Sequence, residues 1–473
     1  MMLQISVIGT GYLGATHAAG MAELGFDVLG VDNNPAKAAA LAAGRVPFHE
    51  PGLPDLLREQ VEQGRLRFGT SLIEAARFAD IHFLCVGTPE GPTGAADISQ
   101  LYSAIDGLVP HLTRNCLIVG KSTVPVGTAE ALVERINGLA PEGISVDLAW
   151  NPEFLREGHA VYDTLHPNRL VFGVTTPDAE WALRQVYSEA ITAGSPVVVT
   201  NLPTAELVKV SANAFLATKI SFINAMAELC EITGADVTLL ADALGHDDRI
   251  GRKFLGAGLG YGGGCLPKDV RALIARAGEL GVAESVSFLD SVDAINRRRR
   301  ERVVRETLGL LRETGSPGRV AILGAAFKPL SDDVRDSPAL EVAVRLHAMG
   351  VDVTVFDPEA NRSASLIAPD LRYAPTATAA VLGADIVLHL TEWREFRDLD
   401  PVLLRSVARG RVFIDARNVL DPEPWLAAGW DFRALGRLVA REVDSSRVDH
   451  YSNRPESAPS TMPVAKATIR TSR

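Results

Sequence analysis

The chain of 473 residues is 47% apolar, which is enough for several hydrophobic cores and, at ~100–200 residues per domain, for about three domains. Its net charge of −11 is spread without a long acidic or basic block, so nucleic acid and anionic membranes are not expected as partners. The four cysteines lack paired spacing and no uncharged apolar run reaches the ~18 residues of a membrane span, so a cytoplasmic location without disulfides is expected.

An apolar strand pattern at residues 3–8 begins the chain directly, so no signal peptide is expected. Gly9, Gly11 and Gly14 follow in GxGxxG spacing, then a helical stretch and a second strand pattern that ends at Asp32. This order is the dinucleotide-binding fingerprint, in which the glycines admit a pyrophosphate to the helix N-terminus and the acid binds the adenosine ribose. Because a carboxylate repels a 2′-phosphate, we expect NAD rather than NADP.

The strand patterns of the first part of the chain return in its last third. The corresponding segments are 5–9 and 320–324, 28–32 and 353–357, and 79–84 and 384–389. In both parts strands alternate with helical stretches, which predicts an α/β fold of two doubly wound, Rossmann-like parallel sheets. The second copy lacks the later glycines of the fingerprint, so we expect it to bind a different nucleotide group.

The intervening residues 201–300 have a helical pattern, with a long apolar stretch at 207–229 that we expect to be buried on several sides. Such a helix could form both a hinge and a subunit interface. Lys209 and Asn213 lie four residues apart on one face, and a lysine on a buried helix is a candidate for a site unless it extends to solvent. The arginine run at 297–300 is expected to be a solvated helix face.

These patterns predict a domain order along the chain. It consists of an NAD-binding domain at 1–200, a central helical hinge and dimerisation domain at 201–300, a nucleotide-sugar-binding domain at 317–437 and a disordered tail at 441–473. No histidine and cysteine cluster has the spacing of metal ligands, so no metal site is predicted.

The most informative segment is 262–269, in which Cys265 follows three glycines and precedes a helical pattern. Pro267 is suited to the first turn of a helix. The helix dipole and Lys268 should lower the pKa of the thiol, and Asp269 would lie one turn along on the same face. The segment therefore combines a candidate nucleophile with an acid–base group. The alternative is an inert cysteine beside a glycine turn.

Over residues 3–437 the chain resembles the UDP-glucose/GDP-mannose dehydrogenase family, most of all its UDP-glucose 6-dehydrogenase branch. The motifs that carry the resemblance occur in order: GTGYLG at 9–14, EPGL at 50–53, VGTP at 86–89, KSTVPVGT at 121–128, NPEFLREG at 151–158, Lys209 with Asn213, RIG at 249–251, GGGCLPKD at 262–269, and FKP at 327–329 with DVRDSP at 333–338. Leu266 stands where many UDP-glucose enzymes carry phenylalanine.

The resemblance implies an NAD-dependent four-electron oxidation of UDP-glucose to UDP-glucuronate through a cysteine thiohemiacetal and thioester. The alternatives are a GDP-mannose or other nucleotide-sugar 6-dehydrogenase and, against the intact catalytic set, a non-catalytic nucleotide-sugar sensor. By resemblance Cys265 is the nucleophile. Lys209 and Asn213 stabilise the oxyanion, and Asp269 moves protons through water held by Thr123. Glu153 assists hydrolysis.

The resemblance also implies binding residues. Those for the cofactor are Gly9, Gly11, Tyr12, Leu13, Gly14, Asp32, Lys37, Thr88, Pro89, Thr123, Glu157 and Arg335. Those for the substrate are Glu153, Phe154, Leu155, Lys209, Asn213, Arg249, Phe254, Leu255, Tyr261, Gly262, Lys328 and Arg417. Because the family lends the arginine corresponding to Arg249 across a subunit interface, we expect at least a homodimer.

Overall fold

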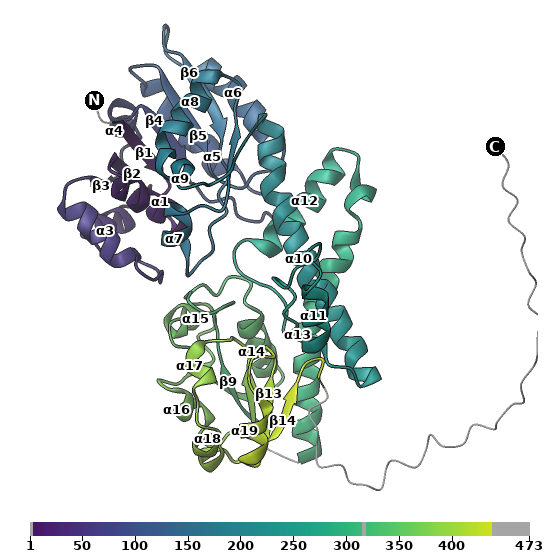
Figure 1. Cartoon of the computed structure of the whole chain (residues 1–473). Coiled ribbons are helices and arrows are strands. Elements are labelled where there is room, and N and C mark those ends of the chain that lie inside the picture. The colour runs from purple at the N-terminus through teal and green to yellow at the C-terminus, as the bar shows by residue number, and fades with distance from the viewer. Residues whose placement is uncertain (1–2, 315–317, 438–473) are drawn as a thin grey trace, which may run out of the picture. The chain divides into compact units, whose positions relative to one another are not determined.

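Two α/β lobes with parallel sheets are connected by a segment of long helices (Figure 1). The structure is a computed structural model and describes residues 3–314 and 318–437, so the tail predicted at 441–473 lies outside the described residues. We call residues 3–200 the N-terminal lobe, 201–314 the central helices and 318–437 the C-terminal lobe. The predicted fold class, two Rossmann-like sheets joined by helices, is confirmed.

The N-terminal sheet has eight strands in the order β3-β2-β1-β4-β5-β6-β7-β8. The first six are parallel, whereas β7 runs antiparallel to β6 and parallel to β8. The strands are β1 Gln4–Ile8, β2 Asp27–Val31, β3 Leu66–Gly69, β4 Ile81–Leu84, β5 Cys116–Gly120, β6 Val146–Trp150, β7 Leu170–Gly173 and β8 Val197–Thr200. Their parallel part therefore has the strand order of a dinucleotide-binding sheet.

Short polar residues begin many of the helices that cover this sheet. Asn34, Ser71 and Thr176 each accept hydrogen bonds from backbone amides at the start of a helix, which satisfies donors without a partner in the helix. The helices are α1 Tyr12–Glu23, α2 Pro35–Ala42, α3 Leu53–Glu62, α4 Leu72–Phe78, α5 Ser99–Leu108, η1 Val109–His111, α6 Thr128–Leu139, α7 Ala160–Leu165, α8 Pro177–Val186 and α9 Ser188–Thr192.

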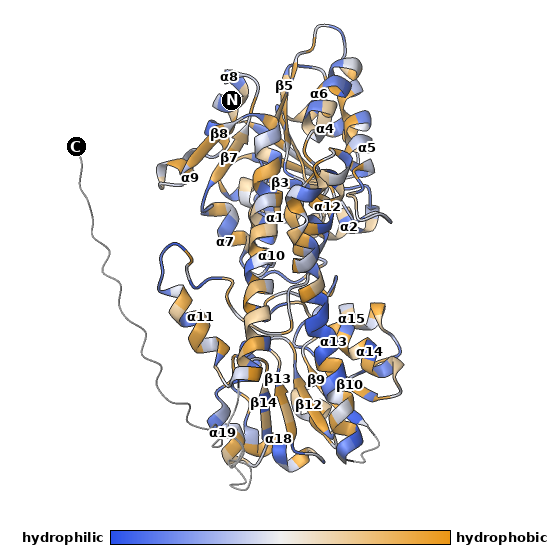
Figure 2. Cartoon of the chain, turned by 90° about the vertical axis from the view of Figure 1, so that its right-hand side faces the viewer, coloured by the Kyte–Doolittle hydropathy of each residue, from blue (hydrophilic) through white to orange (hydrophobic). Residues whose placement is uncertain are grey.

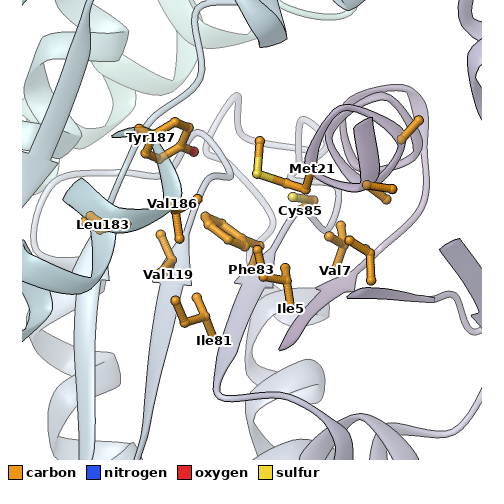
Figure 3. Close-up of a cluster of buried hydrophobic side chains, with 14 of the residues drawn as sticks. Ile5, Val7, Met21, Ile81, Phe83, Cys85, Val119, Leu183, Val186 and Tyr187 are labelled. Carbon is orange, nitrogen blue, oxygen red and sulfur yellow. The ribbon is translucent and has the colours of Figure 1, made fainter. Parts of the chain in front are cut away.

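The core of this lobe lies on both faces of the sheet. Ile5 and Val7 of β1 belong to one buried cluster, whereas Ile8 belongs to the cluster on the opposite face. Figure 3 shows the first cluster, in which Phe83 of β4 packs with Met21 of α1. Successive side chains of a strand point to opposite faces, so strands covered by helices on both sides are apolar throughout. Packing on both faces therefore holds the strands in place, and the site is built at their carboxyl ends.

The C-terminal sheet has six parallel strands in the order β11-β10-β9-β12-β13-β14, which repeats the order of the first six strands of the N-terminal sheet. The strands are β9 Arg319–Leu323, β10 Asp352–Phe356, β11 Arg372–Tyr373, β12 Ile386–His389, β13 Val412–Asp415 and β14 Asp431–Ala434. The helices are α14 Pro338–Ala348, α15 Asn361–Ile367, α16 Ala377–Val381, α17 Arg394–Arg397, α18 Pro401–Val407 and α19 Pro422–Ala427. The internal repeat read from the sequence is thus a repeat of topology.

The central helices are α10 Leu202–Thr233, α11 Val237–Gly245, α12 Leu266–Glu279, η2 Ala283–Val286 and α13 Phe288–Thr314. The long α10 begins at the cap Asn201 and ends at Gly234, whose φ of 80° closes the helix in the left-handed conformation. It packs against α12 and α13. Because α13 continues to Thr314, the helical segment extends beyond the predicted limit at residue 300.

None of the helices within 3–314 and 318–437, α10 included, combines the length and apolar character needed to cross a membrane.

The prediction of a solvated face for the arginine run in α13 is wrong for two of its four residues. Although α13 is largely hydrophilic (Figure 2), Arg299 is 0% exposed and Arg300 is 2% exposed. Arg299 donates to the carbonyl oxygen of Gly258 at 3.1 Å, and Arg300 donates to that of Tyr261 at 2.8 Å. Four successive residues of a helix cover a full turn, so some of the four arginines must point toward the protein. The two buried side chains stabilise the backbone of the loop that leads to Cys265.

The last described residues return to the central helices. The amide of Gly436 donates to Glu231 of α10 at 2.7 Å, and its carbonyl accepts from the amide of Val237 at 3.0 Å. A Cβ atom at Gly436 would lie 2.6 Å from the Cβ atom of Ala227, so only glycine allows this approach. The C-terminal lobe is therefore attached to the central helices at its end as well as at its beginning.

We expect Gly120→Ala to destabilise the N-terminal lobe. Gly120 of β5 lies beside the buried Trp150 of β6, and a Cβ atom there would lie 2.2 Å from the indole ring. Overpacking of this kind costs about 1–3 kcal/mol. Urea denaturation measures the loss. Gly138→Ala in α6 is the matched control, because its Cβ atom would meet nothing within 4 Å, and its unfolding midpoint should not fall. Equal midpoints for the two variants would contradict the packing argument.

Candidate active site

A cavity of about 770 Å³ lies at the carboxyl ends of the strands of the N-terminal sheet. Its walls come from the loops that follow β1, β2, β3, β4, β5 and β6, where ligands bind in doubly wound sheets. The predicted cofactor residues in its lining are Gly9, Gly11, Tyr12, Leu13, Asp32, Lys37, Thr88, Pro89, Thr123, Glu157 and Arg335. The cavity also reaches Glu153, Leu155 and Cys265, so it joins the cofactor loop to the candidate nucleophile.

The three glycines of the fingerprint have three different roles. Gly9 has a φ of +87°, and its Cβ atom would lie 2.9 Å from the backbone of Cys85. A Cβ atom at Gly14 would lie 1.8 Å from the carbonyl oxygen of Gly9, so the first turn of α1 can pack on the loop only without a side chain. A Cβ atom at Gly11 would meet nothing within 4 Å, because Gly11 faces the cavity. The empty space at Gly11 fits a pyrophosphate at the start of α1.

Asp32 is held in position by the same loop. It is 5% exposed and accepts hydrogen bonds from the amide and hydroxyl of Thr10 at 2.9 and 3.1 Å and from the amide of Asn34 at 3.0 Å. Lys37 pairs with it at 3.1 Å. Burial alone would raise the pKa of Asp32, but the hydrogen bonds from Asn34, Lys37 and Thr10 lower it. The carboxylate is therefore charged at the edge of the cavity, as a site for a ribose hydroxyl requires.

The corresponding acid of the C-terminal lobe, Asp357, serves its own backbone. One carboxylate oxygen accepts from the amides of Ala325 and Ala326 at 2.7 and 3.0 Å and from the Trp393 indole at 3.0 Å. The other accepts from the amides of Glu359 and Ala360. With five donors bound, this carboxylate has no capacity left for a ribose, which agrees with the incomplete second fingerprint.

The glycines before Cys265 make room for the C-terminal lobe. A Cβ atom at Gly262 would lie 2.3 Å from the carbonyl oxygen of Asp336, one at Gly263 2.7 Å from the Phe327 ring, and one at Gly264 2.4 Å from the Arg335 guanidinium. The amide of Gly263 donates to the carbonyl oxygen of Arg335 at 3.0 Å. In the structure these glycines therefore admit the 327–336 segment.

Cys265 is the N-cap of α12, with Pro267 in the first turn, and the amide of Asp269 donates to its carbonyl oxygen at 3.0 Å. Its side chain opens into the cavity but is otherwise surrounded by protein. The prediction of a lowered thiol pKa is wrong, because burial raises the pKa of Cys265 to about 11. Lys209 and Lys268 lower the pKa, and the carboxylates of Asp269 and Glu153 raise it. Desolvation outweighs the charges of the two lysines.

Lys209 is the cation that lowers the pKa of that thiol most. It lies on α10, is 5% exposed and pairs with Glu153 at 3.0 Å. Burial would lower the pKa of Lys209, but the charges of Glu153, Cys265 and Asp269 raise it, so the ammonium stays charged. The second oxygen of Glu153 accepts from the amide of Leu155 at 2.6 Å. The buried lysine therefore has a carboxylate partner, as its burial requires.

The Asp269 carboxylate accepts hydrogen bonds from two side chains beside Cys265. It is 1% exposed and accepts from the Asn213 amide group at 2.7 Å and from the Lys268 ammonium at 2.6 Å. Asn213 lies one turn beyond Lys209 on α10, so both side chains reach α12 from the same helix face, as the four-residue spacing predicted. The carboxylate is thereby oriented beside Cys265 from two sides.

Glu157 lies where the cavity meets the C-terminal lobe. It accepts from the Ser331 hydroxyl at 2.9 Å and lies 3.5 Å from Arg335, whose amide and guanidinium both donate to Asp333. Burial and the Asp333 charge raise the pKa of Glu157 to about 7, against the influence of Ser331 and Arg335. Residues 151–156 form no helix, so Glu153 and Glu157 are directed to different partners.

Several predicted substrate residues lie outside the cavity. Leu255 is packed in a cluster with α10 and α11, and the Tyr261 ring is packed among α10, α12 and α13. Phe254 is 42% exposed with a φ of +64°. The side chain of Arg249 is 89% exposed and pairs with Asp247, so a single chain leaves it away from the site. Phe154 lies in a smaller cavity behind Glu153.

Lys328 and Arg417 lie on the C-terminal lobe. Burial lowers the pKa of Lys328, and the charges of Glu157, Cys265 and Glu50 oppose this. Lys328 is not among the residues that line the cavity. Arg417 donates to the carbonyl oxygens of Leu390 and Gly260 at 2.6 and 3.2 Å and pairs with Glu392. It therefore holds the loop before Cys265 against the carboxyl edge of the second sheet.

The sequence did not single out some residues that the structure places in the site. Ser331 and Asp333 determine the surroundings of Glu157, and Arg300 pairs with Asp336 at 2.7 Å behind Gly262. Their partners are distant in sequence, so local spacing carried no signal for them. Among residues 3–314 and 318–437, no group of three or more histidine, cysteine, aspartate or glutamate residues is arranged to hold a metal ion.

Comparison with known protein families gives three matches along the chain. Models of the UDP-glucose/GDP-mannose dehydrogenase family match with the NAD binding domain at residues 3–191, the central domain at 203–298 and the UDP binding domain at 321–422. The matched NAD binding domain contains the cavity loops, and the matched UDP binding domain contains Lys328 and Arg417.

Individual relatives cover almost the whole chain. The UDP-glucose 6-dehydrogenase of Pseudomonas aeruginosa is 41% identical over 454 residues, which are 94% of this chain and 100% of that protein. The UDP-glucose 6-dehydrogenase TuaD of Bacillus subtilis is 40% identical over 94% of this chain and 95% of its own. Among solved structures, a UDP-glucose dehydrogenase from Pyrobaculum islandicum has a TM-score of 0.84 at 37% identity, covering 93% of this chain and 98% of that one.

We expect Glu157→Gln to change how stability depends on pH. Because the pKa of Glu157 is raised from 4.5 to about 7, its contribution to wild-type stability is present below pH 4.5 and is lost as pH rises toward 7. The glutamine variant lacks this loss, so its stability relative to wild type should rise by about 1–3 kcal/mol over that range. Urea denaturation at several pH values measures it. Glu62→Gln, at an exposed position of α3, should parallel wild type; a parallel profile for Glu157→Gln would contradict the assignment.

Proposed function

This chain belongs to the UDP-glucose/GDP-mannose dehydrogenase family, and from that premise we propose that it oxidises UDP-glucose to UDP-glucuronate with NAD. The observation that carries the proposal is the convergence of Lys209, Glu153 and Asp269 around Cys265, which lines the same cavity as the dinucleotide fingerprint. A nucleotide-sugar sensor would need neither the thiol nor the buried charges around it.

NAD, when bound, accepts hydride from C6 of the sugar, once for each of the two oxidation steps. Gly11, Tyr12 and Asp32 are the residues that would hold it along the cavity. Glu157 and Arg335 line the cavity near Cys265 and would contact its nicotinamide half. Because these residues lie on fixed strand ends, the reacting atoms are oriented before chemistry begins.

The thiol of Cys265 adds to the aldehyde that the first oxidation leaves, forming a carbon–sulfur bond and a thiohemiacetal. Removal of a hydride and a proton from the thiohemiacetal gives a thioester. Water then cleaves the carbon–sulfur bond, which releases the carboxylate and restores the thiol. The Lys209 ammonium is held at 3.0 Å from Glu153. It stabilises the oxyanion of the thiohemiacetal and that of the adduct formed when water attacks the thioester, with the Asn213 amide as a second donor.

Asp269 is the proton acceptor we assign to the alcohol and to water, with Thr123 holding water near it. Its two hydrogen bonds from Asn213 and Lys268 orient the carboxylate toward the reacting groups. Since burial raises the pKa of Cys265 to about 11, the thiol needs a base before it attacks. Asp269 on the next turn of α12 is placed to serve as that base.

We propose that UDP is bound by the C-terminal lobe, as the match to a UDP binding domain and the cation Lys328 support. The near-complete coverage of relatives named UDP-glucose 6-dehydrogenase favours glucose as the sugar. GDP-mannose 6-dehydrogenase activity is the alternative.

We also propose a homo-oligomer, at least a dimer, in the cytoplasm. Phe215, Phe222 and Leu229 of α10 are 67%, 47% and 54% exposed and recur every seventh residue, so one chain leaves an apolar stripe along this helix uncovered. Arg249 is likewise exposed in the single chain, as a residue donated to a partner would be. Unpaired cysteines favour a reducing compartment.

The substrate is tested by NADH absorbance with UDP-glucose and, separately, with GDP-mannose. We expect two NADH to form per UDP-glucose. The kcat/KM for GDP-mannose should be lower than that for UDP-glucose by about a hundredfold or more, because a nucleotide sugar with different polar groups leaves buried polar groups of the site unpaired. NADP in place of NAD should be poorly used because of Asp32. Equal rates with both sugars, or with GDP-mannose alone, would overturn the substrate assignment.

Cys265→Ser should stop turnover while leaving the fold intact. A serine hydroxyl is a weaker nucleophile, and its ester hydrolyses more slowly than a thioester, so we expect kcat to fall about 10³-fold or more. Mass spectrometry should detect an acyl-enzyme or no adduct at all, and Cys116→Ser, at a partly buried cysteine outside the cavity lining, is the matched control. Steady-state turnover of Cys265→Ser at the wild-type rate would remove Cys265 from the mechanism.

A further inference from the structure

We propose that Glu50 is a positioning residue. It couples the glycine loop at 9–14, the cofactor loop, to the loop at 151–158 that carries Glu153 and Glu157, the acidic loop. It belongs to the EPGL motif, whose role neither the cavity nor the proposed mechanism explains. The activity assay for this proposal rests on the proposed function, whereas the contacts from which it is argued do not depend on that function.

Glu50 is 1% exposed and connects two walls of the cavity from behind. Its carboxylate accepts a hydrogen bond from the Tyr12 hydroxyl and others from the amides of Gly158 and Ala160, at 2.6 and 2.7 Å. The Tyr12 hydroxyl also accepts from the amide of Gly158 at 2.9 Å. The three groups form a closed set, in which no member can move without breaking a hydrogen bond of another.

Each partner of Glu50 belongs to a segment that lines the cavity. Tyr12 begins α1 in the glycine loop, and Gly158 follows directly on Glu157. One buried carboxylate therefore sets the distance between the cofactor wall and the wall that carries Glu153, Leu155 and Glu157. Glu50 itself is absent from the cavity lining, so it acts through these neighbours.

The residues next to Glu50 also contact the C-terminal lobe. Gly158 has a φ of +79°, and a Cβ atom there would lie 2.6 Å from the Cβ atom of Leu330. The residue before Glu50, His49, donates its amide to Asp332 at 3.0 Å and its ring lies 3.3 Å from Glu359. The loop at 49–50 therefore holds the acidic loop on one side and the C-terminal lobe on the other.

A buried carboxylate without an ion pair is costly, which argues against a merely structural role. In the part of the chain that the structure describes, no lysine, arginine or histidine pairs with Glu50, and its partners are backbone amides and a hydroxyl. Burial raises its pKa, with the amides of Gly158, Ala160 and Val161 and the charge of Lys328 acting against the rise. A carboxylate accepts all these donors at once, whereas the single acceptor oxygen of glutamine cannot.

The test measures Glu50→Gln, Glu50→Asp and Tyr12→Phe against Glu62→Gln, an exposed glutamate of the neighbouring α3. Because hydrogen bonds to a buried charge are strong, we expect Glu50→Gln to raise KM for NAD and lower kcat by about tenfold each. KM for UDP-glucose should change less than about threefold, since the C-terminal lobe supplies its main contacts. Glu62→Gln should match wild type.

The effects of Glu50→Gln and Tyr12→Phe should be non-additive in kcat/KM for NAD, because both remove one connection. Additive effects, or a fall in activity that follows only the fraction of folded protein with both KM values unchanged, would overturn the proposal. Should Glu50→Gln fail to fold, Tyr12→Phe alone must raise KM for NAD, and an unchanged value would overturn the proposal.

Calorimetric binding of NAD to wild type and to both variants separates this inference from the proposed function. If UDP-glucose were not the substrate, wild type would show no turnover with it, yet Glu50→Gln should still bind NAD about tenfold more weakly than wild type. Equal NAD affinity in wild type and Glu50→Gln would overturn the positioning role whatever the sugar.

Discussion

The close approach of residues 262–264 to the C-terminal lobe is the constraint on which the site depends. Three successive Cβ positions would meet the backbone of Asp336, the ring of Phe327 and the guanidinium of Arg335, so a side chain at Gly262 or Gly263 would push the lobes apart. Cys265 follows immediately and begins α12. The nucleophile is therefore placed by contact with the very lobe that we propose binds the nucleotide, and its position depends on how that lobe is seated.

Around this nucleophile the structure buries charges in compensated sets. Lys209 is paired with Glu153, and Asp269 is bound by Asn213 and Lys268, so each buried charge has a partner of opposite sign or a donor. Glu157 also has a donor in Ser331 and a cation in Arg335, but burial and the nearby Asp333 charge outweigh them and raise its pKa to about 7. The site thus keeps the Lys209 ammonium charged while the pKa of Glu157 lies at about 7. Environments that move pKa values apart in this way separate acid and base roles.

The sequence predicted the elements and the local parts of the site because those depend on short spacing. The two sheets, Gly9, Gly11 and Gly14, the α10 pair Lys209 and Asn213, and the placement of Asp269 relative to Cys265 all follow from periods of two or four residues. The raised pKa of Cys265, the burial of Arg299 and Arg300, and the Tyr261 ring within the helical core do not. Each is decided by side chains that become neighbours only after folding, and desolvation has no signature in local sequence.

The return of the chain at Gly436 to α10 and α11 has a mechanical consequence. A body held at one point can turn about any axis through that point, whereas a body held at two points can turn only about the line that joins them. The C-terminal lobe is held through α13, which packs against α14, and again at Gly436, where Glu231 and Val237 bind its backbone. Any rotation of this lobe that moved residues 327–336 relative to Cys265 would therefore have to keep both attachments or break one of them.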